Sequence, residues 1–332
     1  MVNGDTGASS RAAETDPDIV VLRRSAHGMS TIDYAAELRK RLPDRTVVRA
    51  DTPELERALL ASARVATGHR LSGELLSAAT NLELFASATA GVGHLPLDDL
   101  QDGGVILTNA SGIHGANIAE YVMGAILTFT RNFHISRRRN DRREWRHHQS
   151  LELNGSTVTV VGLGAIGEAI VDRLGPFGVR TIGVRYTPEK GGPTDEVIGF
   201  DTDQIHGALA RTEYLVLACP LTDETRDLVG AEEFHTLPPD SVLVNVGRGP
   251  IVDTEAVVGA IRRNGIRGAF LDVTDPEPLP EDHPLWSFGN VFVTPHNAGH
   301  TPQYYVRLAE LVAENVTRLE AGDIDAIENR VL

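Results

Sequence analysis

The chain has 332 residues, of which 41% are hydrophobic, and it carries a formal net charge of −15 at pH 7. Because this length exceeds what one hydrophobic core normally supports, two domains are expected. The acidic balance argues against nucleic acid as a partner, since phosphate backbones attract basic surfaces. No apolar run approaches the ~20 residues that a membrane span requires.

The first 17 residues are polar and rich in Gly, Ser and Asp, with no hydrophobic segment after a basic start. This composition predicts a disordered leader over residues 1–17 rather than a signal peptide. The single cysteine, Cys219, excludes an internal disulfide framework. We therefore expect a cytoplasmic protein.

Short apolar runs alternate with longer segments of helical periodicity in the first third of the chain. The runs are DIVVLR, RTVVRA, ARVATG, LELFAS and VILTN, with helical stretches such as YAAELRKRL and PELERALLASA among them. Continuous runs rich in Val and Ile are typical of parallel strands that are buried on both faces. This series predicts a small doubly wound domain.

A second series of apolar runs comprises TVTVVG, RTIGVR, EYLVLACP, SVLVNVG, GAFLDV and NVFVTPH. These runs predict about six strands, the usual size of a nucleotide-binding sheet. Between the two series lies NIAEYVMGAILTFTRNF, a predicted helix long enough to cross from one domain to the other. Another amphipathic helix, QYYVRLAELVAENVTRLEAG, lies near the end of the chain.

Basic residues cluster in SRRRNDRREWRHH, residues 136–148. Such a cluster is compatible with phosphate or nucleic-acid binding. In an acidic chain it is more often a solvated face, which is the interpretation we favour.

The segment VVGLGAIG contains the pattern G-x-G-x-x-G between a predicted strand and a predicted helix. Gly162 would make the tight turn, Gly164 would let the backbone approach a pyrophosphate, and Gly167 would let helix and strand pack closely. The helix start, with Ala165 and Ile166, would present N–H groups to the phosphates. The pattern predicts dinucleotide binding, and the competing interpretation is a tight strand-to-helix turn without a ligand.

Arg185 follows the next predicted strand, where an Asp or Glu would bind the adenosine ribose 2′-hydroxyl of NAD. A guanidinium cannot accept a hydrogen bond from that hydroxyl, but it can pair with a 2′-phosphate, helped by Thr187 and Lys190. The segment therefore predicts NADP as the cofactor, with NAD as the alternative. The competing interpretation is an arginine that lies over the adenine and is indifferent to the phosphate.

Polar residues follow further strands of the second series: Arg248 follows SVLVNVG, Asp272 ends GAFLD and His296 follows NVFVTP, while Glu277 lies in the loop DVTDPEPLP. Ligands of open α/β sheets bind outside the carboxyl ends of the strands. An arginine can anchor a carboxylate, a histidine can protonate a developing alkoxide, and an acid can hold that histidine charged. The set therefore predicts reduction of a 2-oxo acid. Taken singly, each residue is equally compatible with a surface or capping role.

Several motifs occur in a recognisable order: AGVGHLPLDDL, TNASGIHGANIAEYVMG, LNGSTVTVVGLGAIG, CPLTDETRDLVG, NVGRGPIVD, LDVTDPEPLP and TPHNAG. With these motifs the chain resembles the D-isomer-specific 2-hydroxyacid dehydrogenases over nearly its whole length. That family includes D-lactate, glyoxylate/hydroxypyruvate and D-3-phosphoglycerate dehydrogenases.

The resemblance implies that Arg248 binds the substrate carboxylate, that His296 is the general acid of the reduction, and that Glu277 orients the imidazole and favours its charged form. Backbone N–H groups of Val92 and Gly93, next to Gly91, are expected to hold the carboxylate from the other domain. Asp272 is expected to bind the nicotinamide carboxamide. Further cofactor contacts are expected from Pro220, Thr225, Val246, Gly247, His296 and Ala298.

The resemblance also implies an α/β fold of two doubly wound parallel sheets, with a Rossmann cofactor domain inserted into a smaller flavodoxin-like substrate domain. The expected bounds are 18–114 with 300–332 for the substrate domain and 115–299 for the NAD(P)-binding domain. A homodimer is expected through the cofactor domain, with the helix NIAEYVMGAILTF and the arm after it as the candidate interface.

Two function hypotheses remain. One is a reductase of small 2-oxo acids that yields D-2-hydroxy acids and prefers NADPH. The other is a corepressor-like protein that binds the dinucleotide, recruits partners and turns over little substrate. The absence of a basic surface favours the enzyme, although such corepressors also keep the catalytic residues.

Other reactive side chains have simpler interpretations. Cys219 lies in an apolar strand and is expected to be a buried small hydrophobe rather than a nucleophile. His94 and His114 are expected to be loop or hinge residues, and no spacing suggests a metal site. The loops around His69, Arg70 and SGIHG specify no particular 2-oxo acid.

Overall fold

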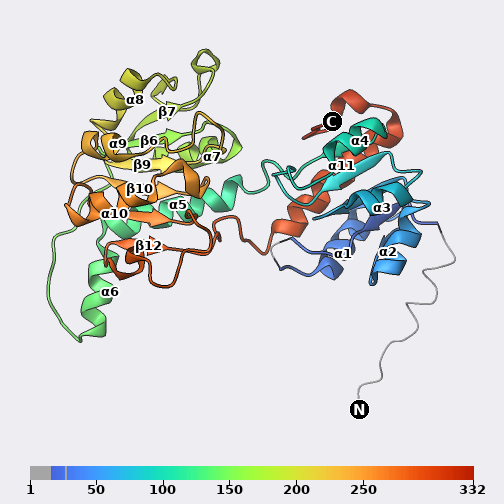
Figure 1. Ribbon diagram of the computed structural model, residues 1–332, viewed down its shortest axis with the longest axis horizontal. Coiled ribbons are helices and arrows are strands. Elements are labelled where there is room, and N and C mark those ends of the chain that lie inside the picture. The colour runs from blue at the N-terminus through green and yellow to red at the C-terminus, as the bar shows by residue number, and fades with distance from the viewer. Residues whose placement is uncertain (1–15, 27) are drawn as a thin grey trace. The chain divides into compact units, whose positions relative to one another are not determined.

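The computed structural model describes residues 16–26 and 28–332, which form two compact units (Figure 1). Unit 1 extends to Ile113 and resumes with Thr301–Leu332, whereas unit 2 comprises His114–His300. The leader predicted over residues 1–17 lies outside the described residues, apart from Asp16 and Pro17.

Unit 1 is built around a five-stranded parallel sheet with the order β2-β1-β3-β4-β5. Its strands are β1 (Ile19–Val21), β2 (Val47–Arg49), β3 (Val65–Gly68), β4 (Leu84–Ser87) and β5 (Ile106–Thr108). This is the flavodoxin-like order, in which the progression of strands reverses between β1 and β3.

Three of the five helices of unit 1 begin at a residue whose side chain caps the first turn. The five helices are α1 (Thr31–Arg41), α2 (Pro53–Leu60), α3 (Gly73–Ala78), α4 (Leu97–Asp102) and α11 (Tyr304–Ala321). The hydroxyls of Ser30, Thr52 and Ser72 accept hydrogen bonds from the first turns of α1, α2 and α3. The predicted last helix is α11, which packs against α1 and ends at Gly322, where φ is +74°.

Unit 2 contains a seven-stranded sheet with the order β12-β11-β10-β9-β6-β7-β8. Its strands are β6 (Thr157–Val161), β7 (Arg180–Val184), β8 (Glu196–Ile198), β9 (Tyr214–Leu217), β10 (Val242–Asn245), β11 (Gly268–Leu271) and β12 (Val291–Val293). All pairs are parallel, and the order is that of a Rossmann sheet extended by β12. The predicted fold is confirmed: two parallel sheets, with the larger inserted in sequence within the smaller.

The predicted number of strands in the second series is too small by one, because β8 was missed. This strand has three residues, EVI, and only Ile198 of them is buried. It lies at the edge of the sheet beside β7, where a strand can be stable with only one face buried. A run this short and polar gives no apolar signal in the sequence.

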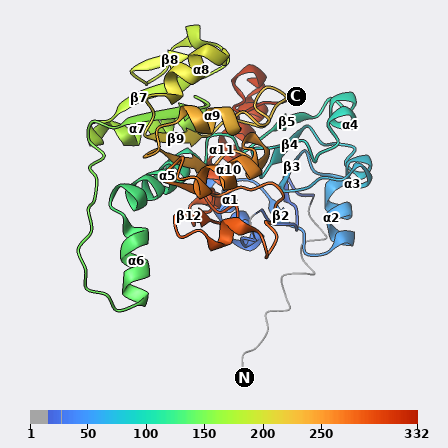
Figure 2. The ribbon, with the colours of Figure 1, turned by 60° about the vertical axis from the view of Figure 1, so that its left-hand side comes forward.

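The helices of unit 2 are α5 (Gly115–Thr130), α6 (Phe133–Asp141), α7 (Ala165–Leu174), α8 (Thr202–Leu209), α9 (Ala231–Thr236) and α10 (Thr254–Arg262). Helix α5 packs against α7 and belongs entirely to unit 2. In Figures 1 and 2, α6 and the segment after it project away from the sheet of this unit. No helix among the described residues is long and apolar enough to cross a bilayer.

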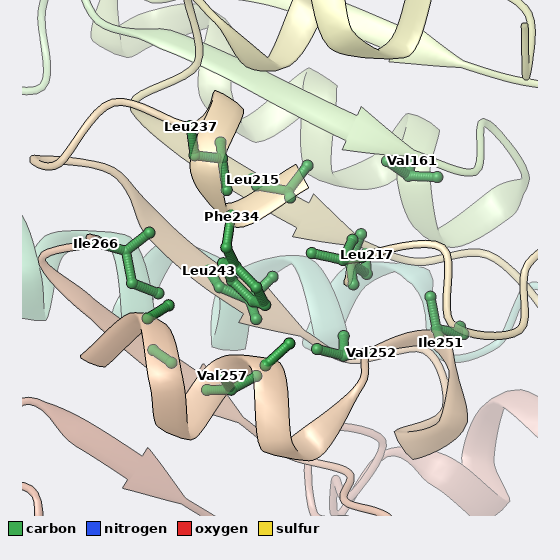
Figure 3. Close-up of a cluster of buried hydrophobic side chains, with 14 of the residues drawn as sticks. Val161, Leu215, Leu217, Phe234, Leu237, Leu243, Ile251, Val252, Val257 and Ile266 are labelled. Atoms are coloured by element: carbon green, nitrogen blue, oxygen red, sulfur yellow. The ribbon is translucent and has the colours of Figure 1, made fainter. Parts of the chain in front are cut away.

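Apolar side chains fill the space between the sheet of unit 2 and the helices on one of its faces. Figure 3 shows Leu215 and Leu243 of the sheet with Phe234 of α9 and Val257 of α10. Leu243 is 0% exposed, at the centre of this cluster. Continuous burial of the strands explains their unbroken apolar runs.

Replacing Leu243 with alanine is expected to destabilise unit 2 by about 3 kcal/mol, because a fully buried leucine leaves a cavity that closes only in part. The measurement is urea unfolding followed by circular dichroism. Leu151→Ala is the matched control, since Leu151 is 43% exposed, and it should cost no more than about 0.5 kcal/mol. Equal costs at the two positions would contradict the assigned core.

Candidate active site

The glycine-rich turn lies between β6 and α7, and its three glycines are used differently. Gly162 has a φ of +98°, and a Cβ there would lie 2.7 Å from the backbone of Cys219, after β9. A Cβ on Gly167 would lie 1.9 Å from the Gly162 carbonyl oxygen, whereas around Gly164 there is open space. Two glycines are therefore required for close packing, and the third leaves room for a ligand where the strand order reverses between β6 and β9.

The start of α7 adds hydrogen-bond donors to this turn. The first intrahelical bond runs from Glu168 N–H to the Gly164 carbonyl, so the N–H groups of Ala165, Ile166 and Gly167 have no acceptor one turn earlier. No side chain of the described part of the chain caps this end. Free donors at the positive end of a helix dipole suit a pyrophosphate.

Arg185 comes directly after β7 and lies beside the glycine turn. Gly162 N–H donates to the carbonyl of Val184, the preceding residue, at 2.8 Å. The Arg185 side chain crosses its own loop, and Nη1 donates to the Gly191 carbonyl at 2.7 Å. Three further side chains of this loop are exposed, namely Thr187, Glu189 and Lys190.

Tyr186 joins this loop to the loop after β9, a contact that the sequence did not indicate. Its ring packs against Phe200 with centroids 4.7 Å apart. Its hydroxyl lies 2.9 Å from Thr222 Oγ1 and donates to Glu224 Oε2 at 3.0 Å. The two loops therefore form one wall beside the glycine turn.

The loop after β9 is shaped by Thr225, one of the predicted cofactor contacts. Thr225 is 0% exposed and its hydroxyl donates to the Pro220 carbonyl at 2.7 Å. The same oxygen accepts from the N–H of Thr222 at 2.7 Å. The side chain of Thr225 thus holds the loop, and the chain around Pro220 forms its surface.

Asp272, at the end of β11, is the most connected polar residue of the site. It is 2% exposed, and its carboxylate accepts from the N–H groups of Asn297 and Ala298, each at 2.8 Å. It also accepts from the hydroxyls of Thr294 at 2.8 Å and Tyr121 at 3.0 Å. Four donors compensate the buried charge, so Asp272 holds the loop after β12 in place.

Tyr121 is a second residue that the sequence did not indicate. It lies on α5, and its hydroxyl bonds with both Asp272 and Thr294. Burial raises the pKa of this hydroxyl, so it stays a donor at all ordinary pH values. The amide of Asn117, one turn earlier on the same helix, donates to the Ala298 carbonyl at 2.9 Å.

His296 lies on the loop that Asp272 holds. Its φ is +53°, a conformation that non-glycine residues rarely adopt and that often marks a functional site. Its N–H donates to the Asp272 carbonyl at 2.8 Å, and Nδ1 lies 2.7 Å from Glu277 Oε1. The Glu277 carboxylate therefore pairs with Nδ1 of His296, and Nε2 is left to meet a reactant. The side chains of His296 and Glu277 are 45% and 43% exposed.

Arg248 follows β10 on a turn that Asn245 stabilises. The buried Asn245 side chain accepts from Gly247 N–H at 3.0 Å and donates to the Arg248 carbonyl at 3.1 Å. Asp272 N–H donates to the Asn245 carbonyl at 3.0 Å, so the ends of β10 and β11 are adjacent. Arg248 itself is exposed, and its Nη1 donates to the Gly247 carbonyl at 2.7 Å. The structure thus gathers Arg248, Asp272 and His296 at one edge of the sheet.

The predicted substrate loop Gly91–Gly93 follows β4 in unit 1. A Cβ on Gly91 or Gly93 would meet no atom within 4 Å, so both glycines border open space. The Thr89 hydroxyl donates to the Gly91 carbonyl at 2.9 Å. Among the described residues, the N–H groups of Val92 and Gly93 have no acceptor, as a site for a carboxylate requires.

Among the described residues, the other reactive side chains form no second candidate catalytic or metal site. Cys219 is 4% exposed, and burial raises the pKa of its thiol to about 11, so it is not a thiolate at neutral pH. His114 Nδ1 lies 3.1 Å from the Gly299 carbonyl oxygen. The basic cluster falls on α6 and the exposed segment after it. The described residues contain no group of three His, Cys, Asp or Glu that could hold a metal ion.

Comparison with known proteins agrees with this arrangement. The family model described as "D-isomer specific 2-hydroxyacid dehydrogenase, NAD binding domain" matches residues 123–298. A glyoxylate reductase of Thermofilum pendens is 33% identical over 262 residues, which are 77% of this chain and 77% of that protein.

Two solved structures resemble the chain over almost its whole length. A D-isomer specific 2-hydroxyacid dehydrogenase of Xanthobacter autotrophicus, in complex with NADPH and MES, has a TM-score of 0.79 and 28% identity, covering 96% of this chain and 98% of that one. An NADPH-dependent glyoxylate/hydroxypyruvate reductase of Sinorhizobium meliloti, in complex with NADP and malonate, has a TM-score of 0.71 and 27% identity, covering 96% and 97%.

Fold and glycine turn together define unit 2 as an NAD(P)-binding domain and the protein as an oxidoreductase. The chain belongs to the family of D-isomer-specific 2-hydroxyacid dehydrogenases.

The glycine turn gives a paired test. Gly164→Ala should leave the stability of unit 2 unchanged, since the methyl group enters open space, but should weaken NADPH and NADH binding at least about 10-fold by obstructing the pyrophosphate. Gly167→Ala should destabilise unit 2 by more than about 2 kcal/mol, because the methyl group overlaps a carbonyl oxygen. Melting temperature and fluorescence titration separate the two effects. A Gly167→Ala protein as stable as Gly164→Ala would contradict the assigned packing.

Proposed function

We propose that this enzyme reduces small 2-oxo acids to D-2-hydroxy acids and prefers NADPH. The observation that carries the proposal is the pair formed by His296 and Glu277, whose Nδ1 and Oε1 atoms are 2.7 Å apart. His296 belongs to a loop held by the buried carboxylate of Asp272, at the sheet edge where Arg248 also emerges. The relatives named as glyoxylate reductases support a small 2-oxo acid.

The reaction joins a hydride and a proton to the substrate carbonyl group. The Arg248 guanidinium binds the carboxylate of the 2-oxo acid and polarises the neighbouring carbonyl. The N–H groups of Val92 and Gly93, in unit 1, are further donors for a substrate carboxylate. The nicotinamide, when bound, supplies the hydride to C2. His296 Nε2 donates its proton to the carbonyl oxygen, and the Glu277 carboxylate stabilises the imidazolium beforehand. In the reverse reaction His296 accepts the proton.

The cofactor is held mainly by backbone groups. The N–H groups of Ala165 and Ile166, together with the Gly162–Gly167 turn, bind the pyrophosphate. Further contacts come from Pro220 at the adenosine side, on the loop that the buried Thr225 holds. Around the nicotinamide they come from Val246, Gly247, Asp272, His296 and Ala298. Asp272 also shapes the nicotinamide end of the site, since its carboxylate positions the N–H groups of Asn297 and Ala298.

The NADPH preference is proposed from the loop after β7. Arg185, Thr187 and Lys190 offer two positive charges and a hydroxyl to a 2′-phosphate. The guanidinium of Arg185 is braced by the Gly191 carbonyl, which reduces the entropy lost on binding. Two relatives of known structure hold NADPH or NADP.

Cytoplasmic location and a homodimer stay predictions. The proposed interface is α5 with the arm after it. Phe133 and Trp145, on α6 and just beyond, are 57% and 98% exposed. Large exposed aromatic side chains of this kind are enriched at protein interfaces.

The cofactor proposal is tested by Arg185→Asp. The substitution removes the guanidinium and adds a carboxylate that repels the 2′-phosphate and suits the 2′-hydroxyl. The ratio of kcat/KM for NADPH over that for NADH should fall roughly 10- to 1,000-fold. Glu189→Gln is the matched control in the same loop and should leave the ratio within about a factor of 3. An unaltered ratio in Arg185→Asp would mean that this loop does not select the cofactor.

The role of Glu277 is tested by Glu277→Gln. The neutral amide cannot make a charge-assisted hydrogen bond to the imidazole of His296, so kcat/KM for reduction should fall at least about 10-fold. Glu281→Gln removes an exposed acid nearby and should leave kcat/KM within about a factor of 3. Equal kcat/KM for wild type and Glu277→Gln would exclude the proposed pair.

A further inference from the structure

Two arginines emerge side by side at the carboxyl edge of the sheet of unit 1. Arg24 follows β1 and Arg70 follows β3. The ends of these strands are close, because Leu22 N–H donates to the Thr67 carbonyl at 2.8 Å and a Cβ on Gly68 would lie 2.6 Å from Leu22 Cβ. The loops that carry the two arginines therefore start from adjacent points.

The strand order of unit 1 makes this edge a preferred place for a ligand. The progression β2-β1-β3-β4-β5 reverses between β1 and β3, and open α/β sheets bind ligands outside the strand ends at such a point. An open hollow of about 460 Å³ lies here, bounded by the starts of α2 and α3. These two helices lie side by side in Figures 1 and 2. Its charged lining residues are Arg23, Arg24, Glu54, Glu56, Arg57, Arg70 and Glu74.

The charges that line the hollow are only partly neutralised. Glu56, 4% exposed, accepts from the N–H of Arg23 at 2.9 Å and lies 3.3 Å from its Nε. Arg57 pairs with Glu74 at 2.5 Å. Within residues 16–26 and 28–332, Arg24 and Arg70 form no hydrogen bond or ion pair. The lining also includes Glu54, which forms no ion pair within the described residues. Four arginines and three glutamates leave the hollow with an excess of one positive charge, and the two unpaired guanidinium groups suit an anion.

Two histidines connect this hollow with the Gly91–Gly93 loop. His94 directly follows Gly93, and its Nε2 lies 2.7 Å from the carbonyl oxygen of His69, the residue before Arg70. The two rings stack with centroids 5.2 Å apart. Burial lowers the pKa of His69, and the charges of His94, Arg70 and Arg24 lower it further.

We propose that Arg24 and Arg70 bind a second anionic group of the substrate, a carboxylate or a phosphate, remote from the reacting carbonyl. The inference rests on the proposed function, in which the N–H groups of Val92 and Gly93 are donors for a substrate carboxylate. It narrows the substrate class to 2-oxo acids that carry a further acidic group. It also assigns a role to Arg70, whose loop specifies no particular substrate by its sequence.

The test compares kcat/KM for three 2-oxo acids. 2-Oxobutyrate has no second acid, 2-oxoglutarate has a second carboxylate, and 3-phosphohydroxypyruvate has a phosphate. Wild type should prefer at least one of the two doubly acidic compounds over 2-oxobutyrate, and which one identifies the anion. In Arg24→Gln and in Arg70→Gln that preference should fall roughly 10-fold, the usual effect of losing one charge-assisted hydrogen bond. Turnover of 2-oxobutyrate should stay within about a factor of 3.

Arg64→Gln is the matched control. Arg64 directly precedes β3, whereas Arg70 follows it, and Arg64 pairs with Glu83 away from the hollow. This variant should leave the preference unchanged. Raising ionic strength should lower the wild-type preference more than that of Arg24→Gln or Arg70→Gln. If 2-oxobutyrate is turned over but no preference exists, or if the two variants keep it, the inference is overturned while the proposed function stands. If no 2-oxo acid is turned over, the proposed function itself fails.

Discussion

Every strand of each sheet runs parallel, so all the carboxyl ends of a sheet lie along one edge, and the chemistry of this protein depends on that constraint. In unit 2 the edge carries the glycine turn after β6, Arg185 after β7, Arg248 after β10, and Asp272 and His296 after β11 and β12. Residues far apart in sequence therefore become neighbours because the strands that precede them are paired in the sheet. The helices that return the chain also supply N-termini at the same edge, which adds donors for phosphate.

The buried charge of Asp272 sets the geometry at this edge. A carboxylate that is 2% exposed is tolerated only when donors surround it, and here the donors come from α5, from Thr294 and from the backbone after His296. Removing one donor leaves part of the charge uncompensated, so α5 and the loop after β12 stabilise each other. These bonds maintain the positive φ of His296. The imidazole is therefore already positioned when Glu277 contacts its Nδ1 atom.

Sequence patterns predicted the elements whose signal is local. The glycine turn, the buried strands and the residues just after them follow from spacing and apolar runs, because packing against a sheet imposes a short period. Tyr121 was missed since its partner Asp272 is 151 residues away, and nothing near Tyr121 indicates a polar contact. Tyr186 was missed for the same reason. Strand β8 has too few buried residues to give an apolar signal in the sequence.

The central claim is that the dinucleotide site and the His296–Glu277 pair together turn over a 2-oxo acid. The most direct measurement is steady-state oxidation of NADPH and of NADH by the purified wild-type enzyme with a panel of 2-oxo acids, followed by chiral analysis of the product. We predict oxidation that prefers NADPH, one D-2-hydroxy acid formed per NADPH consumed, and loss of both in His296→Asn. Firm cofactor binding with no oxidation by any member of the panel, the same in wild type and His296→Asn, would contradict it and favour a corepressor-like binding protein.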